Sequence, residues 1–311
     1  MVKLILSRLL QGLLVLFVVS LLVFALLASA GGDALSALRS DPVISEETIK
    51  GLRHIYGLDQ PLVVRYARWL VEVGHGRLGH SFHFQAPVGS ILWPRLLRTG
   101  ALAVIALVIA WSVALTLGAA AARRTGTWVD RLCTALIVLA ASTPRLLLAL
   151  IALALAVRTS FFVVGGPTAE LSNIARLLQL LPAALVLCVP LISLFLAQTR
   201  ASVAGVLGRE FVRAARAKGL PERIILLRHV LRPALNPLIT IFGYSFGSVV
   251  SGSVIVESVM GWPGLGQLSV IAVQSRDVPL LLGVVMVTAT AVLVGNLLAD
   301  ILLRLNDPRL R

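Results

Sequence analysis

The stretch that decides the fold reads Glu210-Phe-Val-Arg-Ala-Ala-Arg-Ala-Lys-Gly219 and continues Leu-Pro-Glu-Arg-Ile-Ile-Leu-Leu-Arg-His-Val-Leu-Arg232. It is basic and helix-prone, yet it lies between two strongly apolar segments. A loop this charged between membrane spans must lie in water, because charge is costly inside a bilayer. We predict a short helix over Phe211 to Lys218, which Gly219 ends and Pro221 prevents from continuing. Such a helix can be bound by a partner's groove, although periodicity alone fits an ordinary basic loop equally well.

The composition predicts an all-α membrane protein. Hydrophobic residues make up 58% of the 311 residues and charged residues 14%, whereas a soluble domain carries roughly 25% charged residues. The apolar residues form runs of about twenty or more, the length that a helix needs to cross a hydrocarbon core of roughly 30 Å. About six transmembrane helices are expected, over Leu9 to Ala30, Thr99 to Ala122, Leu132 to Val157, Leu177 to Thr199, Pro237 to Val256 and Val278 to Ala299.

These spans divide the chain into an N-terminal transmembrane helix (1–30), an extracytoplasmic helical loop (31–98) and a core of five further spans (99–311) with a cytoplasmic loop at 200–235. The first span has signal-peptide features, since Lys3 and Arg8 precede it and Ala28-Ser-Ala30 resembles a cleavage site. Its apolar run exceeds the roughly 7–15 residues of a signal sequence. We therefore expect it to be retained as a helix.

The distribution of basic residues predicts that both termini are cytoplasmic. With the termini inside, sixteen Lys and Arg residues fall on the cytoplasmic side, eight of them between Arg200 and Arg232. The short outer loops hold only Arg158, Arg176 and Arg276. Cytoplasmic loops carry the excess of Lys and Arg in membrane proteins. The same rule accounts for the net charge of +14, and the chain has no recognisable nucleic-acid-binding module.

Two amphipathic helices are predicted in the first outer loop. One begins at Ser45 as N-cap, has Glu46 and Glu47 in its first turn, and stops at Gly57. A second begins near Pro61. The apolar faces of the two helices hold Ile49, Leu52 and Tyr56, and Leu62, Tyr66, Trp69 and Val73. These helices are suited to lie on the membrane surface or to cap the bundle.

Neither the histidines nor the cysteines form a motif that predicts a chemical site. His75, His80 and His83 cluster in the outer loop, but their spacing fits no standard metal site and no acidic or Cys ligand accompanies them. We interpret them as solvated loop residues and expect no metal. Cys133 and Cys188 fall inside apolar segments, where thiols usually serve as small packing residues.

Several motifs, in order along nearly the whole chain, carry a family resemblance. They are Leu58-Asp-Gln-Pro-Leu62, Leu78-Gly-His-Ser81, Ala214-Ala215-x-x-x-Gly219, Leu227-Arg-His-Val-Leu-Arg-Pro-Ala-Leu-Asn-Pro237, Gly252-Ser-Val-Ile-Val-Glu257, Gly261-Trp-Pro-Gly-Leu-Gly266 and Asn296-Leu-Leu-Ala-Asp300 with Asp307-Pro-Arg309. Together they resemble the permease subunits of binding-protein-dependent ABC importers, in the peptide/nickel branch. Arg213 stands where the general motif of the cytoplasmic loop has Glu, and that branch departs from the motif in a similar way.

The resemblance implies a type I ABC importer permease fold and a chain that carries solute without catalysing a reaction. The implied partners are a second permease, two cytoplasmic ATPases and an extracytoplasmic binding protein. ATP and Mg²⁺ would be used by the ATPases, because this chain has no Gly-x-x-x-x-Gly-Lys-Ser/Thr P-loop. The implied ATPase-coupling residues are Glu210, Phe211, Arg213, Ala214, Ala215, Lys218 and Gly219. Di- or oligopeptides are the commonest cargo of the branch, and nickel, opines, glutathione and some sugars are alternatives.

Candidate pathway or gate residues are Arg145, Gly247, Ser251 and Glu257. Gly243, Gly247 and Gly252, with Ser248 and Ser251, suit either a helix that lines the pathway or simple packing. Glu257 precedes a predicted tight turn or re-entrant bend at Gly261–Gly266, and we favour a gating or structural role for it. Arg145 interrupts the third span, where it could bind a substrate carboxylate or pair with an acid on the second permease.

Two other classes of protein are disfavoured. An intramembrane enzyme needs paired acids, or His or Ser constellations, which the spans lack. An ion-coupled carrier needs ionisable coupling residues inside the spans, and Arg145 is weak support for one.

Overall fold

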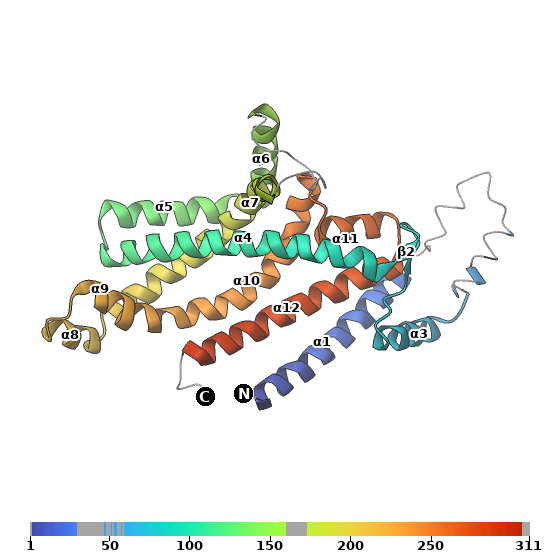
Figure 1. Cartoon of the computed structure of the whole chain (residues 1–311), viewed down its shortest axis with the longest axis horizontal. Helices are drawn as coiled ribbons and strands as arrows, with labels where there is room; N and C mark the ends of the chain where they lie inside the picture. The colour runs from blue at the N-terminus through green and yellow to red at the C-terminus, as the bar shows by residue number, and fades with distance from the viewer. Residues whose placement is uncertain are drawn as a thin grey trace. The chain divides into compact units, whose positions relative to one another are not determined.

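The computed structural model describes residues 2–29, 47, 51, 53–54, 57, 59–159 and 173–306 (Figure 1). Its helices are α1 (Val2–Ser29), α3 (Leu62–Gly74), α4 (Val88–Arg123), α5 (Trp128–Ser142), α6 (Arg145–Thr159), α7 (Asn173–Leu207), α8 (Glu210–Ala217), α9 (Glu222–Ile224), α10 (Leu231–Val259), α11 (Leu265–Gln274) and α12 (Val278–Asn306). A π-helical turn (Ile225–Val230) joins α9 to α10, and β1 (His80–Ser81) pairs with β2 (Ala86–Pro87). The predicted all-α fold is confirmed. The predicted helix from Ser45 falls mostly outside the described residues.

The structure has five or six candidate membrane spans, where about six were predicted, and the ends of the helices differ from the prediction. Within the described ranges, five helices are long and apolar enough to cross a membrane, and the α5–α6 pair makes a sixth if it is counted as one span. The helix that holds the second span begins at Val88, before the predicted start of the span at Thr99. The fifth forms one helical run from Glu222 to Val259, so it continues directly out of the charged loop.

The third span is broken, whereas the sequence predicted one continuous helix over 132–157. α5 and α6 meet at an angle of 96°. Pro144 lies at the break and favours it, because a proline pushes the residue before it out of the helical region, and Thr143 has φ −88° and ψ 119°. The fifteen residues of α5 extend about 22 Å, which is shorter than a hydrocarbon core of roughly 30 Å. Arg145 therefore opens α6 and does not lie in mid-helix.

The described chain divides into two compact units. The first contains Gly100–Trp262 and Ala291–Arg311. In it α7 packs against α5, α6 and α10 around a core that includes Phe195 and Leu196. Two glycines bring α10 close to α12, since a Cβ atom on Gly243 would lie 2.7 Å from the Cβ of Ala299 and one on Gly247 would lie 2.9 Å from Val292. These contacts support the packing interpretation of Gly243 and Gly247.

The second unit contains Val2–Thr99 and Pro263–Thr290. The predicted helix after Pro61 is confirmed as α3, which packs against α1. Tyr66 and Trp69 are buried beside Phe24, and the Tyr66 hydroxyl lies 2.8 Å from the Ser20 hydroxyl. The amphipathic pattern of the outer loop therefore serves to attach α3 to the first transmembrane helix.

Asp277 joins the β hairpin to the start of α12 within this second unit. Its fully buried carboxylate accepts hydrogen bonds from the Ser81 hydroxyl at 2.6 Å, the His83 backbone N–H at 2.9 Å and the Leu280 backbone N–H at 3.1 Å. The bond from Leu280 makes Asp277 the N-cap of α12. One carboxylate thus holds two segments that are far apart in sequence.

The predicted turn over Gly261–Gly266 is shorter than expected. α11 begins at Leu265, so the last two residues of that segment are helical. The Leu265 backbone N–H donates to the Thr99 hydroxyl at 2.8 Å. This bond satisfies one of the amide groups that a helix leaves free at its N-terminus.

Candidate functional site

The predicted helix in the charged loop exists as α8, and it has one buried face. Val212 and Ala215 point into an apolar cluster. The buried members of this cluster, which we call the anchor cluster, are Ala122, Val203, Val206, Val212, Ala215, Ile225, Val230 and Ala234. They come from α4, α7, α8, the π-helical turn and α10. Since burying a valine side chain contributes about 1.5–3 kcal/mol, α8 is held firmly against the ends of the helices around it.

The C-terminus of α8 closes in a Schellman motif. The Gly219 N–H donates to the Arg216 carbonyl at 2.9 Å, and the Leu220 N–H donates to the Ala215 carbonyl at 3.4 Å. Gly219 has φ +76°, a conformation that glycine adopts without steric cost. Arg216 also pairs with Glu222 across this turn, at 2.6 Å, and Glu222 raises the pKa of the Arg216 guanidinium. The loop thus has a defined shape.

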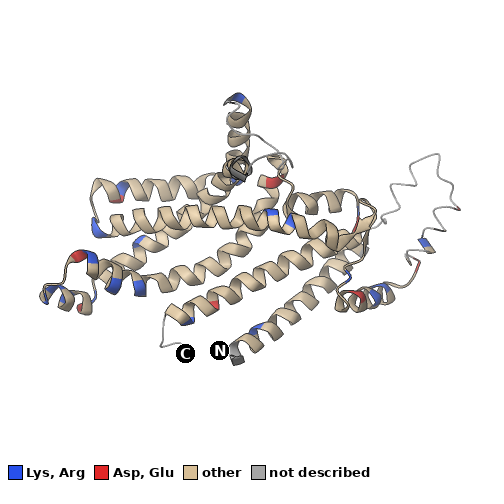
Figure 2. Cartoon of the chain, viewed as in Figure 1, with Lys and Arg blue, Asp and Glu red and all other residues tan. Residues whose placement is uncertain are grey.

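The outward face of α8 is chemically mixed. Of the seven residues predicted to couple to an ATPase, Ala215 is buried and the other six are exposed. Phe211 exposes 43% of its surface, and the basic residues Arg213 and Lys218 of the same segment are exposed as well. Figure 2 shows basic residues gathered around α8 and α9 and at the turn between α4 and α5. An anchored helix that exposes both an aromatic ring and basic side chains is suited to bind a groove on another protein.

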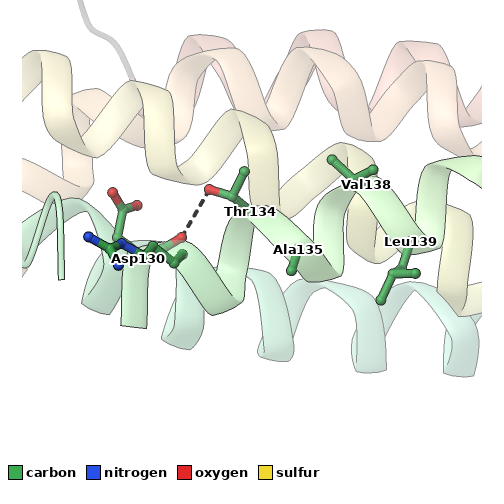
Figure 3. Close-up of a pocket in the computed structure, with 6 residues that line it drawn as sticks. Asp130, Thr134, Ala135, Val138 and Leu139 are labelled. Atoms are coloured by element: carbon green, nitrogen blue, oxygen red, sulfur yellow. Dashed lines mark hydrogen bonds between the residues drawn. The ribbon is translucent and has the colours of Figure 1, made fainter. Parts of the chain in front are cut away.

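An open groove of about 630 Å³ runs along α5 (Figure 3). It is lined by Asp130, Arg131, Thr134, Ala135, Val138 and Leu139. The Thr134 hydroxyl is bonded to the Asp130 carbonyl at 2.9 Å. Most of the lining surface is apolar, so this groove offers few groups that could bind a polar solute.

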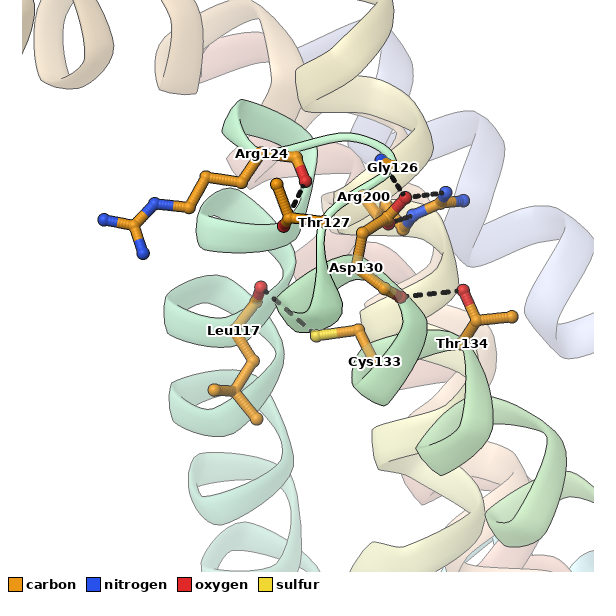
Figure 4. A network of polar contacts seen from close by, with 8 residues as sticks. All are labelled: Leu117, Arg124, Gly126, Thr127, Asp130, Cys133, Thr134 and Arg200. Atoms are coloured by element: carbon orange, nitrogen blue, oxygen red, sulfur yellow. Dashed lines mark hydrogen bonds and ion pairs between the residues drawn. The ribbon is translucent and has the colours of Figure 1, made fainter.

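The Asp130 carboxylate is engaged by Arg200 (Figure 4). The Arg200 guanidinium approaches both of its oxygens, at 2.5 and 3.0 Å, and the Gly126 backbone N–H donates to it at 3.0 Å. This two-pronged geometry gives a strong charge-assisted contact. It ties the α4–α5 turn to α7, next to the anchor cluster. The sequence analysis missed this pair, because the two residues lie 70 positions apart.

The pathway candidates divide between two faces of α10. Gly247 packs against α12, and Glu257 is fully buried. Ser251 is exposed and lies on a stripe of exposed or half-exposed residues with Tyr244 and Ser248. Polar residues on a transmembrane helix usually face a water-filled cavity or another protein chain rather than lipid. Arg145 joins this stripe, because its Nη2 lies 3.4 Å from the Ser248 hydroxyl.

The three outer-loop histidines are exposed and make separate local contacts. His75, His80 and His83 are all exposed. The His75 ring contacts the Val71 carbonyl at 2.7 Å, and the His83 ring packs edge-on against Phe84. In the part of the chain that the structure describes, no group of three or more His, Cys, Asp or Glu residues is arranged to hold a metal ion.

The helical arrangement defines the class of protein. It is the fold of a type I ABC importer permease, and it matches a chain of the inward-facing MetNI methionine ABC transporter with a TM-score of 0.57. The match has 17% sequence identity and covers 70% of this chain and 96% of that chain. The expected fold class is therefore confirmed.

The sequence comparisons identify the family. The profile described as "Binding-protein-dependent transport system inner membrane component" matches residues 114–311, and the corresponding N-terminal profile matches residues 1–103. The chain belongs to this family of multi-pass membrane transport subunits. The oligopeptide transport system permease protein AppB of Bacillus subtilis (strain 168) is 33% identical, over 98% of both chains. A protein of Brucella suis biovar 1 (strain 1330) named as a peptide permease is 34% identical, over 100% of this chain and 99% of its own length.

Proposed function

We propose that this chain is a translocation subunit of an ATP-driven importer for di- and oligopeptides. It would act with a second permease, two cytoplasmic ATPases and an extracytoplasmic binding protein. Family membership supports the transport role, and the names of the relatives from Bacillus and Brucella support a peptide cargo. The proposal depends on one observation: α8 is a short amphipathic helix that is anchored on one face and exposed on the other.

In the proposed mechanism α8 transmits movement of the ATPases to the membrane helices. Phe211, Arg213 and Lys218 would contact the ATPase, while Val212 and Ala215 hold α8 to the anchor cluster. Closure of the ATPase pair around ATP and Mg²⁺ would displace α8 together with the ends of α7 and α10. The exposed stripe of α10 would line the pathway. The chain itself would hydrolyse no ATP, since it has no P-loop.

The proposal is tested by purifying the tagged chain from its native membranes in mild detergent. We expect two P-loop ATPases and a second six-span permease to purify with it, and the reconstituted complex to take up peptides in the presence of ATP and the binding protein.

Phe211→Ala should lower the recovery of ATPase, because it removes an exposed aromatic contact. Trp128→Ala is the matched control, since Trp128 is an exposed aromatic residue at the start of α5, outside α8. Recovery of the chain without any ATPase would refute the proposal.

A further inference from the structure

The Arg145 side chain packs against α10 at a site formed by Gly252 and Ser248. Its guanidinium lies against Gly252, where any side chain would overlap Nη1 and would lie 2.8 Å from Cζ. Its Nη2 lies 3.4 Å from the Ser248 hydroxyl, one turn earlier on the same helix. The missing side chain at Gly252 and the hydroxyl at Ser248 together fix the position of the cation. All of these residues belong to the same compact unit.

The charge of Arg145 has no acidic partner among the residues that the structure describes. Among the described residues, no carboxylate oxygen lies within 4.0 Å of its guanidinium. Glu257 is fully buried and follows Ser248 by nine residues, which places it on the opposite face of α10. Arg145 is also the first residue of α6, where the helix dipole disfavours a positive charge. The residue therefore brings no evident gain to the stability of its own helix.

The surroundings of Arg145 suit an anion that arrives from outside the chain. A guanidinium carries five N–H donors, and the Ser248 contact engages one of its nitrogens. The neighbouring surface of α10 exposes Tyr244, Ser251 and Ser258, which are further hydrogen-bonding groups. Planar carboxylates are the preferred two-pronged partners of arginine.

We propose that Arg145, held by Ser248 and Gly252, is a binding point for the carboxylate of the solute as it passes along α10. This inference rests on the proposed function, in which the solute is a peptide, and it assigns the C-terminal carboxylate of that peptide to Arg145. Contact with this group would make the pathway selective for peptides with a free C-terminus. The selectivity would add to that of the binding protein.

The test compares two substrates in two forms of the complete reconstituted importer. Uptake of one peptide and of its C-terminal amide is measured at concentrations below saturation, for the wild type and for Arg145→Gln. The same binding protein is used throughout, so its own preference cancels when the two acid-to-amide ratios are divided. We expect Arg145→Gln to lower the ratio by about tenfold, the effect of losing a hydrogen bond between charged groups.

Three further variants test the same acid-to-amide ratio. Arg158→Gln removes the same charge from the other end of α6 and should leave the ratio unchanged. Ser248→Ala should lower the ratio by less than Arg145→Gln, because it loosens the arginine without removing it. Arg145→Lys keeps the charge and loses the planar fork, so it should give an intermediate ratio.

Three results would overturn the inference. An equal loss of uptake for acid and amide would mean that Arg145 is only structural. Loss of the second permease from the Arg145→Gln complex would mean that an acid on that partner is its counterion. Absence of wild-type uptake for both peptides would instead refute the proposed function, and the inference with it.

Discussion

At the scale of single residues, Gly219 shows how one backbone angle shapes the charged loop that contains α8. Its φ of +76° is unfavourable for any residue with a Cβ atom, by about 1–2 kcal/mol. A Cβ atom there would meet nothing within 4 Å, so the cost of a substitution is conformational and not steric. Gly219→Ala should therefore lower the melting temperature of the purified importer by about 2–4 °C per kcal/mol lost.

Gly205→Ala is the matched control for this prediction. Gly205 lies in the last part of α7, and a Cβ atom there also meets nothing within 4 Å. Its helical conformation favours alanine over glycine by about 1 kcal/mol, so this variant should melt at a higher temperature than the wild type. Thermal unfolding in detergent measures both. Equal shifts in the two variants would show that the positive φ of Gly219 has no energetic consequence.

The sequence predicted the local structure of the charged loop but not which of the site residues are buried. Gly219, Pro221 and the helix between Phe211 and Lys218 could be predicted, because turn and helix signals are local. The burial of Ala215 and Glu257 could not, since it depends on which face of a helix meets its neighbours. Asp130 was missed for the same reason, because its partner Arg200 is brought to it only by the packing of α5 against α7.

At the scale of elements, Asp277 controls the attachment of the β hairpin to α12. Asp277→Ala removes an N-cap and leaves the Ser81 hydroxyl and the His83 N–H without their acceptor. We expect a loss of about 3 kcal/mol in stability. Hydrogen exchange should become faster at residues 80–87, and the effect is measured by mass spectrometry together with thermal unfolding.

Ser81→Ala provides the graded comparison. It removes one of the three bonds to Asp277 and leaves the N-cap bond to Leu280 in place, so its effect should be nearer 1 kcal/mol. Exchange at residues 80–87 that stays slow in the Asp277→Ala variant would contradict this account of the hairpin. The sequence alone could not reveal the contact, which joins positions 196 residues apart.

The α5–α6 break marks the limit of span prediction from hydropathy. A window of apolar residues shows that a segment belongs in the membrane, but it does not show whether the segment is straight. Pro144 was visible in the sequence, yet prolines also lie inside α4, α7 and α10 without ending those helices. Whether a proline bends a helix sharply depends on the packing around it.

At the scale of the whole molecule, the distribution of charge predicts the orientation in the membrane. Thr125 lies in the basic α4–α5 turn, and His75 follows α3; both are exposed. We expect Thr125→Cys to react with an impermeant thiol reagent only in inside-out vesicles, and His75→Cys only in right-side-out vesicles. The native Cys133 and Cys188 are buried, so the background should be low. Labelling of both variants from the same side would contradict the predicted topology.

The run of helix from Glu222 to Val259 has a mechanical consequence. Its 38 residues form a rod about 57 Å long. One end of the rod packs in the anchor cluster that holds α8. The part near its other end contains Gly252, which contacts Arg145. No loop interrupts it, so a displacement of one end can be transmitted along the helix to the other. ATP binding and hydrolysis by a partner and binding of the solute near Arg145 would then both depend on the position of this one helix. The π-helical turn is the place where the helix can flex.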